Sequence, residues 1–436
     1  MLRRKISDEL LKWKNISDKK CLLIKGARQV GKTFIVNDFA EKNYENYIYI
    51  NFELNKGMKN VFEGDLDVDS LVRNLSIRFP KIKFEPGNLL IFLDEIQSCP
   101  NARVSLKSFS MDGRFDVIGS GSLLGLNYKE VSSYPVGYET VIELHSLDFE
   151  EFLWALDIGE DVISYVSEST RNKRPLDLSV LEKMEEYYRW YTVVGGMPDA
   201  VNAFIRTNNF GEVLSAQERI IAGYLDDISK YAPQSKKANV RNVFRSIPTQ
   251  LGKANKKFQY ADVPGQKEGK GNREYGSSLS WLFDAGIVNY CYNLQEPAAP
   301  LAMNVKLNSF KIYLRDTGLL TSLMEPGVRI AVLDGDVTIN QGALIENITA
   351  DVISKKKAML TYFERKGKLE MDFILNLDGI VTAIEVKSGN NRQSKSLDVL
   401  VSEKYKLKRG IKLENSNISV DGPIEHYPLF AIAFLF

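Results

Sequence analysis

The chain has 436 residues, of which 44% are hydrophobic and 26% are charged, and its formal net charge is +1. This length exceeds what one hydrophobic core usually supports, so we expect several domains with the composition of a soluble globular protein. With only two histidines in the chain, histidine-rich metal sites and most histidine-dependent catalytic triads are excluded.

Neither a membrane nor an oxidising compartment is indicated. No apolar run approaches the ~20 residues of a membrane-spanning helix, and no apolar segment follows the basic start of the chain. The cysteines Cys21, Cys99 and Cys291 have no metal-ligand spacing and form no disulfide framework. We therefore expect a cytoplasmic protein that does not contact a membrane.

Residues 21–35, CLLIKGARQVGKTFI, indicate a strand, a glycine-containing loop and the start of a helix. The loop has the pattern G-x-x-x-x-G-K-T, whose backbone N–H groups surround nucleotide phosphates. Lys32 is expected to reach the β and γ phosphates, and the Thr33 hydroxyl to bind Mg²⁺, at a helix N-terminus that favours anions. The residues predicted to bind ATP are Gly26, Ala27, Arg28, Gln29, Val30, Gly31, Lys32 and Thr33.

Residues 89–95, LLIFLDE, indicate a buried strand that ends in two carboxylates. Asp94 is predicted to hold Mg²⁺ through water, and Glu95 to orient the attacking water. The next strand, FDVIGSGS, ends with Ser120 and Ser122 at the same sheet edge, and Ser120 is predicted to contact the γ phosphate. The alternative for these hydroxyls is that they cap a turn. The predicted catalytic residues are Glu95, Lys32 and Ser120.

These elements, over about residues 15–150, resemble the AAA-type P-loop ATPases of the additional-strand class. The stretches SLKSF (105–109), GSLLG (121–125) and LHSLDFEEFL (144–153) are similar to a bacterial and archaeal family. That family joins such an ATPase to a C-terminal domain of unknown function 4143. Many relatives carry Gly-Arg where this chain has Gly137 and Tyr138, so the resemblance supplies no arginine finger there and leaves the oligomeric state open.

The middle of the chain is expected to be helical and then basic. Residues 151–235 have helical periodicity, and residues 236–305 resemble a winged-helix module, with helices followed by a hairpin. From Lys236 to Arg273 there are ten Lys or Arg residues against two acidic ones. Such a module contacts DNA phosphates through lysines, so nucleic acid, DNA rather than RNA, is the expected partner. A solvated loop or an interface with a protein partner is the alternative.

The last third carries the residue order of a nuclease fold. KIYLRDTGLLTSL (311–323) resembles the family's junction sequence. A helix with Glu346, a strand with Glu370 and Asp372, and a strand with Glu385 and Lys387 then resemble the restriction-endonuclease-like (PD-(D/E)xK) fold. The resemblance implies that Asp372 and Glu385 bind Mg²⁺, that Glu346 completes the shell and that Lys387 assists the attacking water. The alternative for Glu385 and Lys387 is an exposed ion pair on a solvent-facing strand.

The sequence therefore predicts an α/β multidomain protein. Its parts are an AAA-type P-loop ATPase core with a parallel sheet (1–150), a helical lid region (151–235), a winged-helix-like module (236–305) and a nuclease-like α/β domain (306–436). We expect ATP and Mg²⁺ as cofactors and a nucleotide state that acts on the nuclease-like domain, whose cleavage activity is left open. The alternative is a signalling or protein-remodelling switch whose nuclease-like domain only binds a partner.

Overall fold

The computed structural model describes residues 2–123, 137–265, 271–336, 342–365, 369–387, 395–402 and 405–436. The ends of the predicted stretches GSLLG and IVTAIEVKSG, and residues 266–270 of the basic stretch, lie outside the described residues. The chain divides into unit 1 (Arg3–His145 with Asp284–Gly286) and unit 2 (Ser146–Phe283 with Ile287–Phe436). The predicted α/β multidomain class is confirmed, while the boundaries predicted at 150, 235 and 305 stay predictions.

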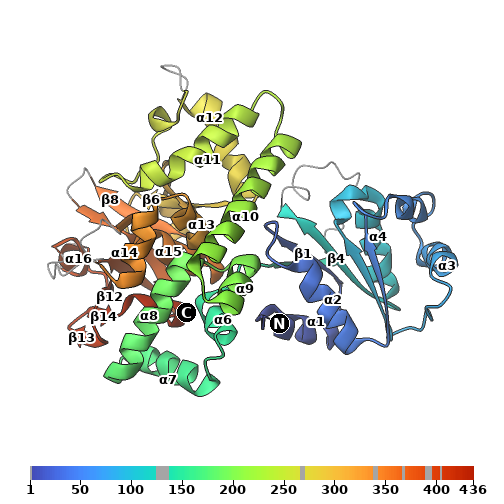
Figure 1. Cartoon of the computed structure of the whole chain (residues 1–436), viewed down its shortest axis with the longest axis horizontal. Coiled ribbons are helices and arrows are strands. Elements are labelled where there is room, and N and C mark those ends of the chain that lie inside the picture. The colour runs from blue at the N-terminus through green and yellow to red at the C-terminus, as the bar shows by residue number, and fades with distance from the viewer. Residues whose placement is uncertain are drawn as a thin grey trace. The chain divides into compact units, whose positions relative to one another are not determined.

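Unit 1 is a parallel five-stranded sheet with helices on both faces (Figure 1). Its strand order is β2-β3-β4-β1-β5, so β4 lies between the P-loop strand β1 and the acidic strand β3. The strands are β1 (Cys21–Gly26), β2 (Asn46–Asn51), β3 (Leu89–Asp94), β4 (Asp116–Ser122) and β5 (Glu139–Glu143). The helices are α1 (Ile6–Lys14), α2 (Lys32–Asn43), α3 (Val68–Arg78) and α4 (Pro100–Asp112), with the 3₁₀ turns η1 (Lys56–Phe62) and η2 (Ile96–Ser98).

The burial of β3 explains why its sequence does not alternate. All six residues of β3 are buried, because one face packs under α3 and α4, the strand also contacts α2, and neighbouring strands continue the sheet on both sides. Leu71 and Leu75 of α3 and Leu106 of α4 belong to this core. The apolar run therefore fixes β3 in the middle of the sheet and brings its polar end to one sheet edge.

Unit 2 begins with helices, as the periodicity predicts. They are α6 (Phe149–Ala155), α7 (Glu160–Arg171), α8 (Leu178–Val194), α9 (Pro198–Thr207), α10 (Phe210–Tyr231), α11 (Lys237–Leu251) and α12 (Gly271–Asp284). The motif LDFEEF starts α6 through a capping box, in which Asp148 accepts from the Glu151 N–H and the Glu151 side chain accepts from the Asp148 N–H. Among the helices described, none combines the length and hydrophobicity of a membrane span.

A four-stranded sheet connects the middle of the chain with its C-terminal part. The predicted hairpin is β6 (Val288–Leu294) and β7 (Val305–Leu314), and β6 also pairs in parallel with β8 (Thr361–Arg365). The sheet order is β7-β6-β8-β9, with β9 at Leu369–Met371. Because β6 pairs with strands on both sides, the hairpin and the C-terminal elements share one sheet.

The second sheet of unit 2 has the order β10-β11-β12-β14-β13. Its strands are β10 (Phe373–Leu377), β11 (Ile380–Val386), β12 (Arg409–Leu413), β13 (Ser419–Asp421) and β14 (Ile424–Tyr427). The associated helices are α13 (Thr317–Ser322), α14 (Pro326–Asp334), α15 (Gly342–Lys355) and α16 (Lys395–Val401), with the 3₁₀ turns η3 (Tyr260–Asp262), η4 (Leu301–Asn304) and η5 (Leu429–Phe434). The prediction that Glu370 and Asp372 lie on one continuous strand is wrong, because the chain passes at Asp372 from β9 in one sheet to β10 in the other.

Candidate functional site

The P-loop follows β1 and ends at the first turn of α2, as the sequence predicts. Gly31 precedes α2 with φ of 93°, a left-handed conformation that costs little only for glycine. Residues 26–33 therefore form a loop that directs the N-terminus of a twelve-residue helix toward the edge of the sheet. Backbone N–H groups at such a helix start are suited to binding phosphate.

Lys32 lies over this loop. Its side chain is buried, and Nζ donates to the carbonyl oxygens of Gly26 at 3.0 Å and Ala27 at 2.8 Å. Burial lowers the pKa of Lys32 to about 8, while the charges of Glu95 and Asp94 act in the opposite direction. A lysine held in this way presents a positive charge at the place where the motif binds phosphate.

Asp94, the last residue of β3, is the centre of a network of oxygen and nitrogen donors. Its Oδ2 accepts from Thr33 Oγ1 at 2.9 Å, from Asn51 Nδ2 at 3.0 Å and from Tyr49 Oη at 3.1 Å. Ser120 donates to the other oxygen, Oδ1. The structure thus brings the two predicted Mg²⁺ residues, Thr33 and Asp94, into direct contact.

Carboxylate and hydroxyl oxygens are the ligands that Mg²⁺ prefers, so the donors present fit this ion. Ser120, by contrast, is fully buried and directs its hydroxyl at Asp94. The Ser120 hydroxyl therefore contacts the end of the acidic strand β3, and its predicted contact with the γ phosphate stays a prediction.

Glu95 lies just beyond the strand, which ends at Asp94 rather than at the predicted residue 95. Its φ of 52° is a left-handed conformation that costs free energy in any residue other than glycine. The Glu95 carboxylate accepts a hydrogen bond from Gln97, and burial raises the pKa of Glu95. A strained, partly desolvated carboxylate next to Lys32 and Asp94 is consistent with a base that acts on water.

Sequence reasoning missed Tyr49, Asn51 and Gln97 at this site. Asn51 ends β2, the strand beside β3, so the rule that polar residues at carboxyl ends of parallel strands meet would have indicated it. Tyr49 precedes Asn51 by two residues and lies on the same strand face. Gln97 is in the short turn η2, for which the sequence has no comparable signal.

A second cluster of charged side chains lies in the C-terminal part of unit 2. Glu346 of α15 is 5% exposed and accepts from Lys256 and, at 2.9 Å, from Tyr313 Oη. Lys311 of β7 is 1% exposed, with Nζ 3.5 Å from Glu346 Oε2 and 2.9 Å from Glu370 Oε1. Both lysines and Tyr313 were missed, although Lys311 interrupts the apolar run SFKIYL.

The other predicted nuclease residues lie at the ends of two strands: Asp372 follows β9, and Glu385 and Lys387 lie at the end of β11. Asp372 Oδ2 accepts from the Val386 N–H at 2.8 Å, and burial together with the charge of Glu346 raises the pKa of Asp372 to about 7. Lys387 Nζ is 2.7 Å from Glu385 Oε1. The Glu385 side chain is 8% exposed, and its Oε2 is buried with no hydrogen-bond partner among the described residues, so an exposed ion pair on a solvent-facing strand does not describe it.

In this arrangement Glu346, Asp372 and Glu385 do not form a three-ligand Mg²⁺ shell, and their predicted roles as metal ligands stay predictions. Within the described ranges, no three acidic, histidine or cysteine side chains converge as metal ligands. Glu346 is instead neutralised by the ammonium groups of Lys256 and Lys311. The structure brings Glu346 and Asp372 into the same electrostatic cluster, but with lysines between the carboxylates.

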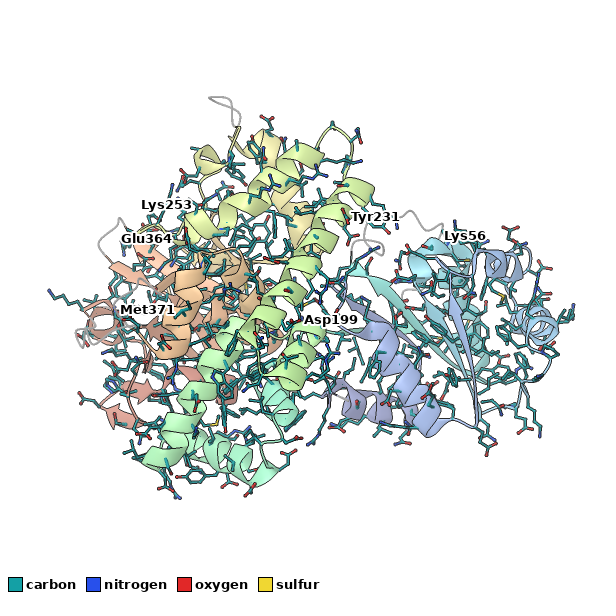
Figure 2. The ribbon with its side chains drawn as sticks, in the orientation of Figure 1. Lys56, Asp199, Tyr231, Lys253, Glu364 and Met371 are labelled. Carbon is teal, nitrogen blue, oxygen red and sulfur yellow. The ribbon has the colours of Figure 1, made fainter. Side chains whose placement is uncertain are left out.

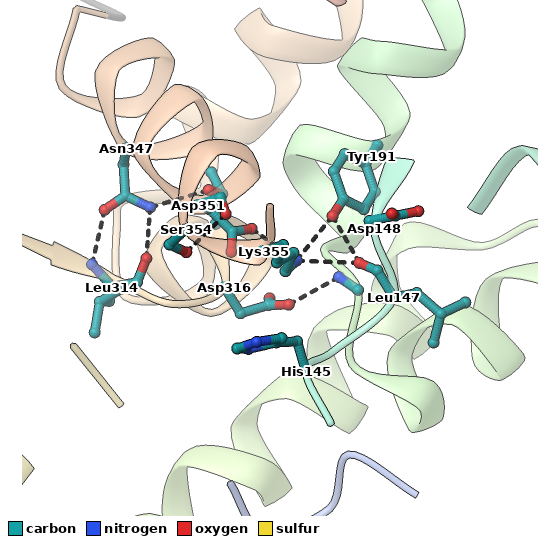
Figure 3. Close-up of polar contacts among 12 residues, drawn as sticks. His145, Leu147, Asp148, Tyr191, Leu314, Asp316, Asn347, Asp351, Ser354 and Lys355 are labelled. Atoms are coloured by element: carbon teal, nitrogen blue, oxygen red, sulfur yellow. Dashed lines mark hydrogen bonds and ion pairs between the residues drawn. The ribbon is translucent and has the colours of Figure 1, made fainter. Parts of the chain in front are cut away.

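A third polar network joins α8 and α15 inside unit 2 (Figure 3). Lys355 Nζ donates to Leu147 O at 3.1 Å, to Tyr191 Oη at 2.9 Å and to Asp351 Oδ2 at 2.9 Å. Asp316 caps α13 and also accepts from the Gly196 N–H at 2.8 Å. The stretch GGMPDAV (195–201) thus meets DTGLL (316–320), which is part of the junction sequence that resembles the family, and this contact indicates a structural role for both.

Three family profiles match successive parts of the chain. The AAA domain matches residues 18–153, a Domain of unknown function (DUF8612) matches 185–328, and a Domain of unknown function (DUF4143) matches 341–428. No curated protein matches the chain.

The similar solved structures are distant. The Walker-type ATPase PABY2304 of Pyrococcus abyssi has 14% identity and a TM-score of 0.44, over 74% of this chain and 96% of its own. The Orc1 protein of Aeropyrum pernix, solved in complex with DNA, has 13% identity and a TM-score of 0.28, over 76% and 91%. RuvB of Thermotoga maritima has 14% identity and a TM-score of 0.31, over 65% and 88%.

At these identities and TM-scores, the solved structures carry no weight for function, whereas the AAA profile covers the whole P-loop site. Residues 18–153 are therefore a P-loop ATPase domain of the AAA type, and residues 341–428 are a DUF4143 domain.

Proposed function

We propose that the site around the P-loop hydrolyses ATP in a Mg²⁺-dependent reaction. The observation that carries this proposal is the contact of Thr33 with Asp94, beside a buried Lys32 that lies over the loop. Bound Mg²⁺ would neutralise charge on the phosphate oxygens. Lys32 and the N-terminus of α2 would bind the phosphates, and Asp94 would position the Thr33 hydroxyl.

Glu95 is the residue proposed to orient the attacking water. Its raised pKa makes it a stronger base than an exposed carboxylate, and Gln97 holds one of its oxygens. Replacement of Glu95 by Gln is expected to leave ATP bound while turnover falls at least ~100-fold, the usual range for a lost general base. Preserved nucleotide binding with full turnover would contradict the role.

We further propose that the DUF4143 region has a nuclease-like fold. Its support is the order of elements, with α15, then β8, the broken strand β9–β10 and β11, then α16 and β12. β10 and β11 are antiparallel, whereas β11 and β12 are parallel across the α16 connection. This is the order in which the restriction-endonuclease-like fold places its acidic residues.

Nucleic acid is the proposed partner, and α11 carries the charges that favour it. Lys237, Arg241 and Arg245 are four residues apart, so they lie along one face of that helix. A row of basic side chains on a helix suits phosphate contacts. α11, α12 and the β6–β7 hairpin follow one another as in a winged helix, and the nucleotide state would act on this module and the nuclease-like domain.

ATP turnover with and without DNA tests this partner. Under the proposal, duplex or single-stranded DNA stimulates turnover, and the stimulation falls steeply with salt because bound phosphates release counterions. Arg245→Ala should reduce the stimulation, whereas Arg206→Ala, which removes an exposed arginine of α9, should not. Turnover that ignores DNA and RNA at every salt concentration would overturn the proposal.

A second function is favoured by the lysines around Glu346. If Lys256 and Lys311 always occupy the place of a metal ion beside Glu346, the C-terminal domain binds a partner and cleaves nothing. The protein then acts as a signalling or remodelling switch. Incubation of single- and double-stranded DNA and RNA with Mg²⁺ or Mn²⁺, with and without ATP, separates the two functions. Cleavage that is lost in Lys387→Ala supports a nuclease, and intact substrates together with ATP turnover support the switch.

A further inference from the structure

The segment 252–259, which follows α11, is held against the edge of β7. The Phe258 N–H donates to Phe310 O at 2.9 Å, and Lys257 forms an antiparallel bridge with Lys311. The rings of Phe258 and Phe310 stack with centroids 6.1 Å apart. This basic segment (252–259) therefore adds a short extended piece to the sheet that carries Lys311, and Figure 2 labels Lys253 within it.

This placement brings Lys256 to the carboxylate of Glu346, 90 residues further along the chain. The side chains of Lys256 and Glu346 are 18% and 7% exposed. Lys311 approaches the same carboxylate from β7 and also contacts Glu370, while the charge of Asp372 acts on Lys311. Two ammonium groups thus face the carboxylates, and together they carry the charge of one divalent cation.

The two lysines differ in how they are held. Lys311 lies within a paired strand and is 1% exposed, so it cannot leave without disrupting the sheet. Lys256 follows four exposed residues, 252–255, and its segment is not part of a named strand. Lys256 is therefore the ammonium group that can withdraw while the sheet stays intact.

We infer that Lys256 takes the place of a divalent cation at the carboxylates Glu346 and Asp372 and keeps this site closed to metal. The inference rests on the proposed nuclease-like fold, and it makes the basic segment (252–259) an intramolecular inhibitor of that site. Phosphate groups of a nucleic acid compete for the same ammonium group, because the segment belongs to the proposed DNA-binding module. Binding of nucleic acid would then open the site to metal.

Binding of Mn²⁺ alone to the full, nucleotide-free chain tests the inference, with free Mn²⁺ followed by electron paramagnetic resonance. Lys256→Met removes the ammonium group and keeps most of the aliphatic stem. This variant should bind one Mn²⁺ at least ~10-fold more tightly than the native chain. The matched control is Lys257→Met, because the Lys257 side chain makes no ion pair within the part of the chain that the structure describes. This control should bind Mn²⁺ as the native chain does.

A second change locates the bound ion. Adding Asp372→Asn to Lys256→Met should return Mn²⁺ binding to the native level, because the second change removes a carboxylate of the proposed site. Any Mn²⁺ bound at the P-loop is the same in both proteins and cannot cause the difference. If Lys256→Met does not fold, as judged by its melting curve, Lys256→Gln replaces the ammonium group with an amide that can still donate to Glu346.

Two results would overturn the inference. One is a native chain that already binds Mn²⁺ as tightly as the Lys256 variants and loses it in Asp372→Asn. The other is a folded Lys256 variant that gains no Mn²⁺ binding. A protein without cleavage or DNA-stimulated turnover would instead contradict the proposed function, and it would leave the Mn²⁺ titration unaffected because no activity enters that measurement.

Discussion

Asp94 accepts hydrogen bonds from four side chains, and Tyr49 is the one whose contribution is easiest to isolate. Tyr49→Phe removes the hydroxyl that lies 3.1 Å from Asp94 Oδ2 and leaves the ring, which packs against Phe92, in place. Partners of a metal-positioning carboxylate usually affect metal affinity or activity by 10- to 100-fold. We expect Tyr49→Phe to lower ATP turnover about 10-fold and to raise the Mg²⁺ concentration at which turnover is half-maximal.

Tyr47→Phe is the matched control for this prediction. Tyr47 lies two residues earlier in β2, and its hydroxyl donates to Glu41 rather than to the P-loop site. A titration of turnover with Mg²⁺ should separate the two variants. Equal turnover in both would show that the Tyr49 hydroxyl does not support Asp94.

At the level of elements, the close approach of α8 and α13 depends on Gly195. Its φ is +74°, and an added Cβ would lie 2.2 Å from Asp316 Oδ1 and 2.9 Å from Gly318 Cα. Gly195→Ala must therefore displace the aspartate that caps α13 and accepts from Gly196. We expect unit 2 to lose about 2–4 kcal/mol of unfolding free energy, as for other combinations of strain and a lost cap.

The control for Gly195→Ala is Gly327→Ala, in α14 of the same unit. No atom of the described ranges lies within 4 Å of the added Cβ there, and alanine is the better helix former. Chemical denaturation of both variants measures the difference. A Gly195→Ala protein as stable as the native one would mean that the junction between α8 and α13 rearranges without cost.

The packing of α15 on α8 also predicts a pH dependence. Burial raises the pKa of Asp351 to about 7; Lys355 opposes this shift, whereas Asp316 adds to it. The folded chain therefore keeps a proton that the unfolded chain releases above its ordinary pKa. The contribution of protonated Asp351 to the unfolding free energy is fully present below about pH 4 and is lost as pH rises to about 7. Over this range the unfolding free energy falls by at most ~1.4 kcal/mol per pH unit.

The measurement is the unfolding free energy of unit 2 between pH 4 and 8, compared with Asp351→Asn. The amide does not titrate, so the difference between the two proteins should change with pH in this range. A constant difference would show that Asp351 ionises at its ordinary pKa in the folded chain.

The parallel core was predictable because its signals are local. The apolar run of β3 and the G-x-x-x-x-G-K-T loop each specify one element, and a buried parallel strand needs a continuous apolar sequence. Asp94 and Thr33 then meet because β3 ends, and the loop from β1 to α2 lies, at the same edge of the sheet. The order α15, β8, β11 was likewise readable from the helical and alternating patterns.

The cluster around Glu346 was not predictable from the same patterns. Lys256 reaches Glu346 across 90 residues, and this contact depends on how the basic segment (252–259) pairs with β7. The chain also changes sheets at Asp372, where the sequence still reads as one alternating strand. Non-local pairing decides both features, and nothing in a local window of sequence reports it.

For the whole molecule, two compact units offer a test of the proposed coupling. Each has its own hydrophobic core, so thermal unfolding should show two transitions. A ligand at 100 times its Kd stabilises the unit it binds by about 2.7 kcal/mol. ATP with Mg²⁺ will therefore raise the transition of unit 1, and Gly195→Ala, which affects unit 2, identifies the other transition.

If the nucleotide state acts on the C-terminal domain, bound ATP must stabilise one conformation of unit 2 over another. A ligand that binds both conformations with equal affinity does not shift the equilibrium between them. We then expect the transition of unit 2 to move with ATP as well, and both shifts to disappear in Lys32→Ala. Calorimetry with a slowly hydrolysed ATP analogue measures this. A shift confined to unit 1 would mean that the ATPase and the DUF4143 region act independently, and the proposed coupling would fail.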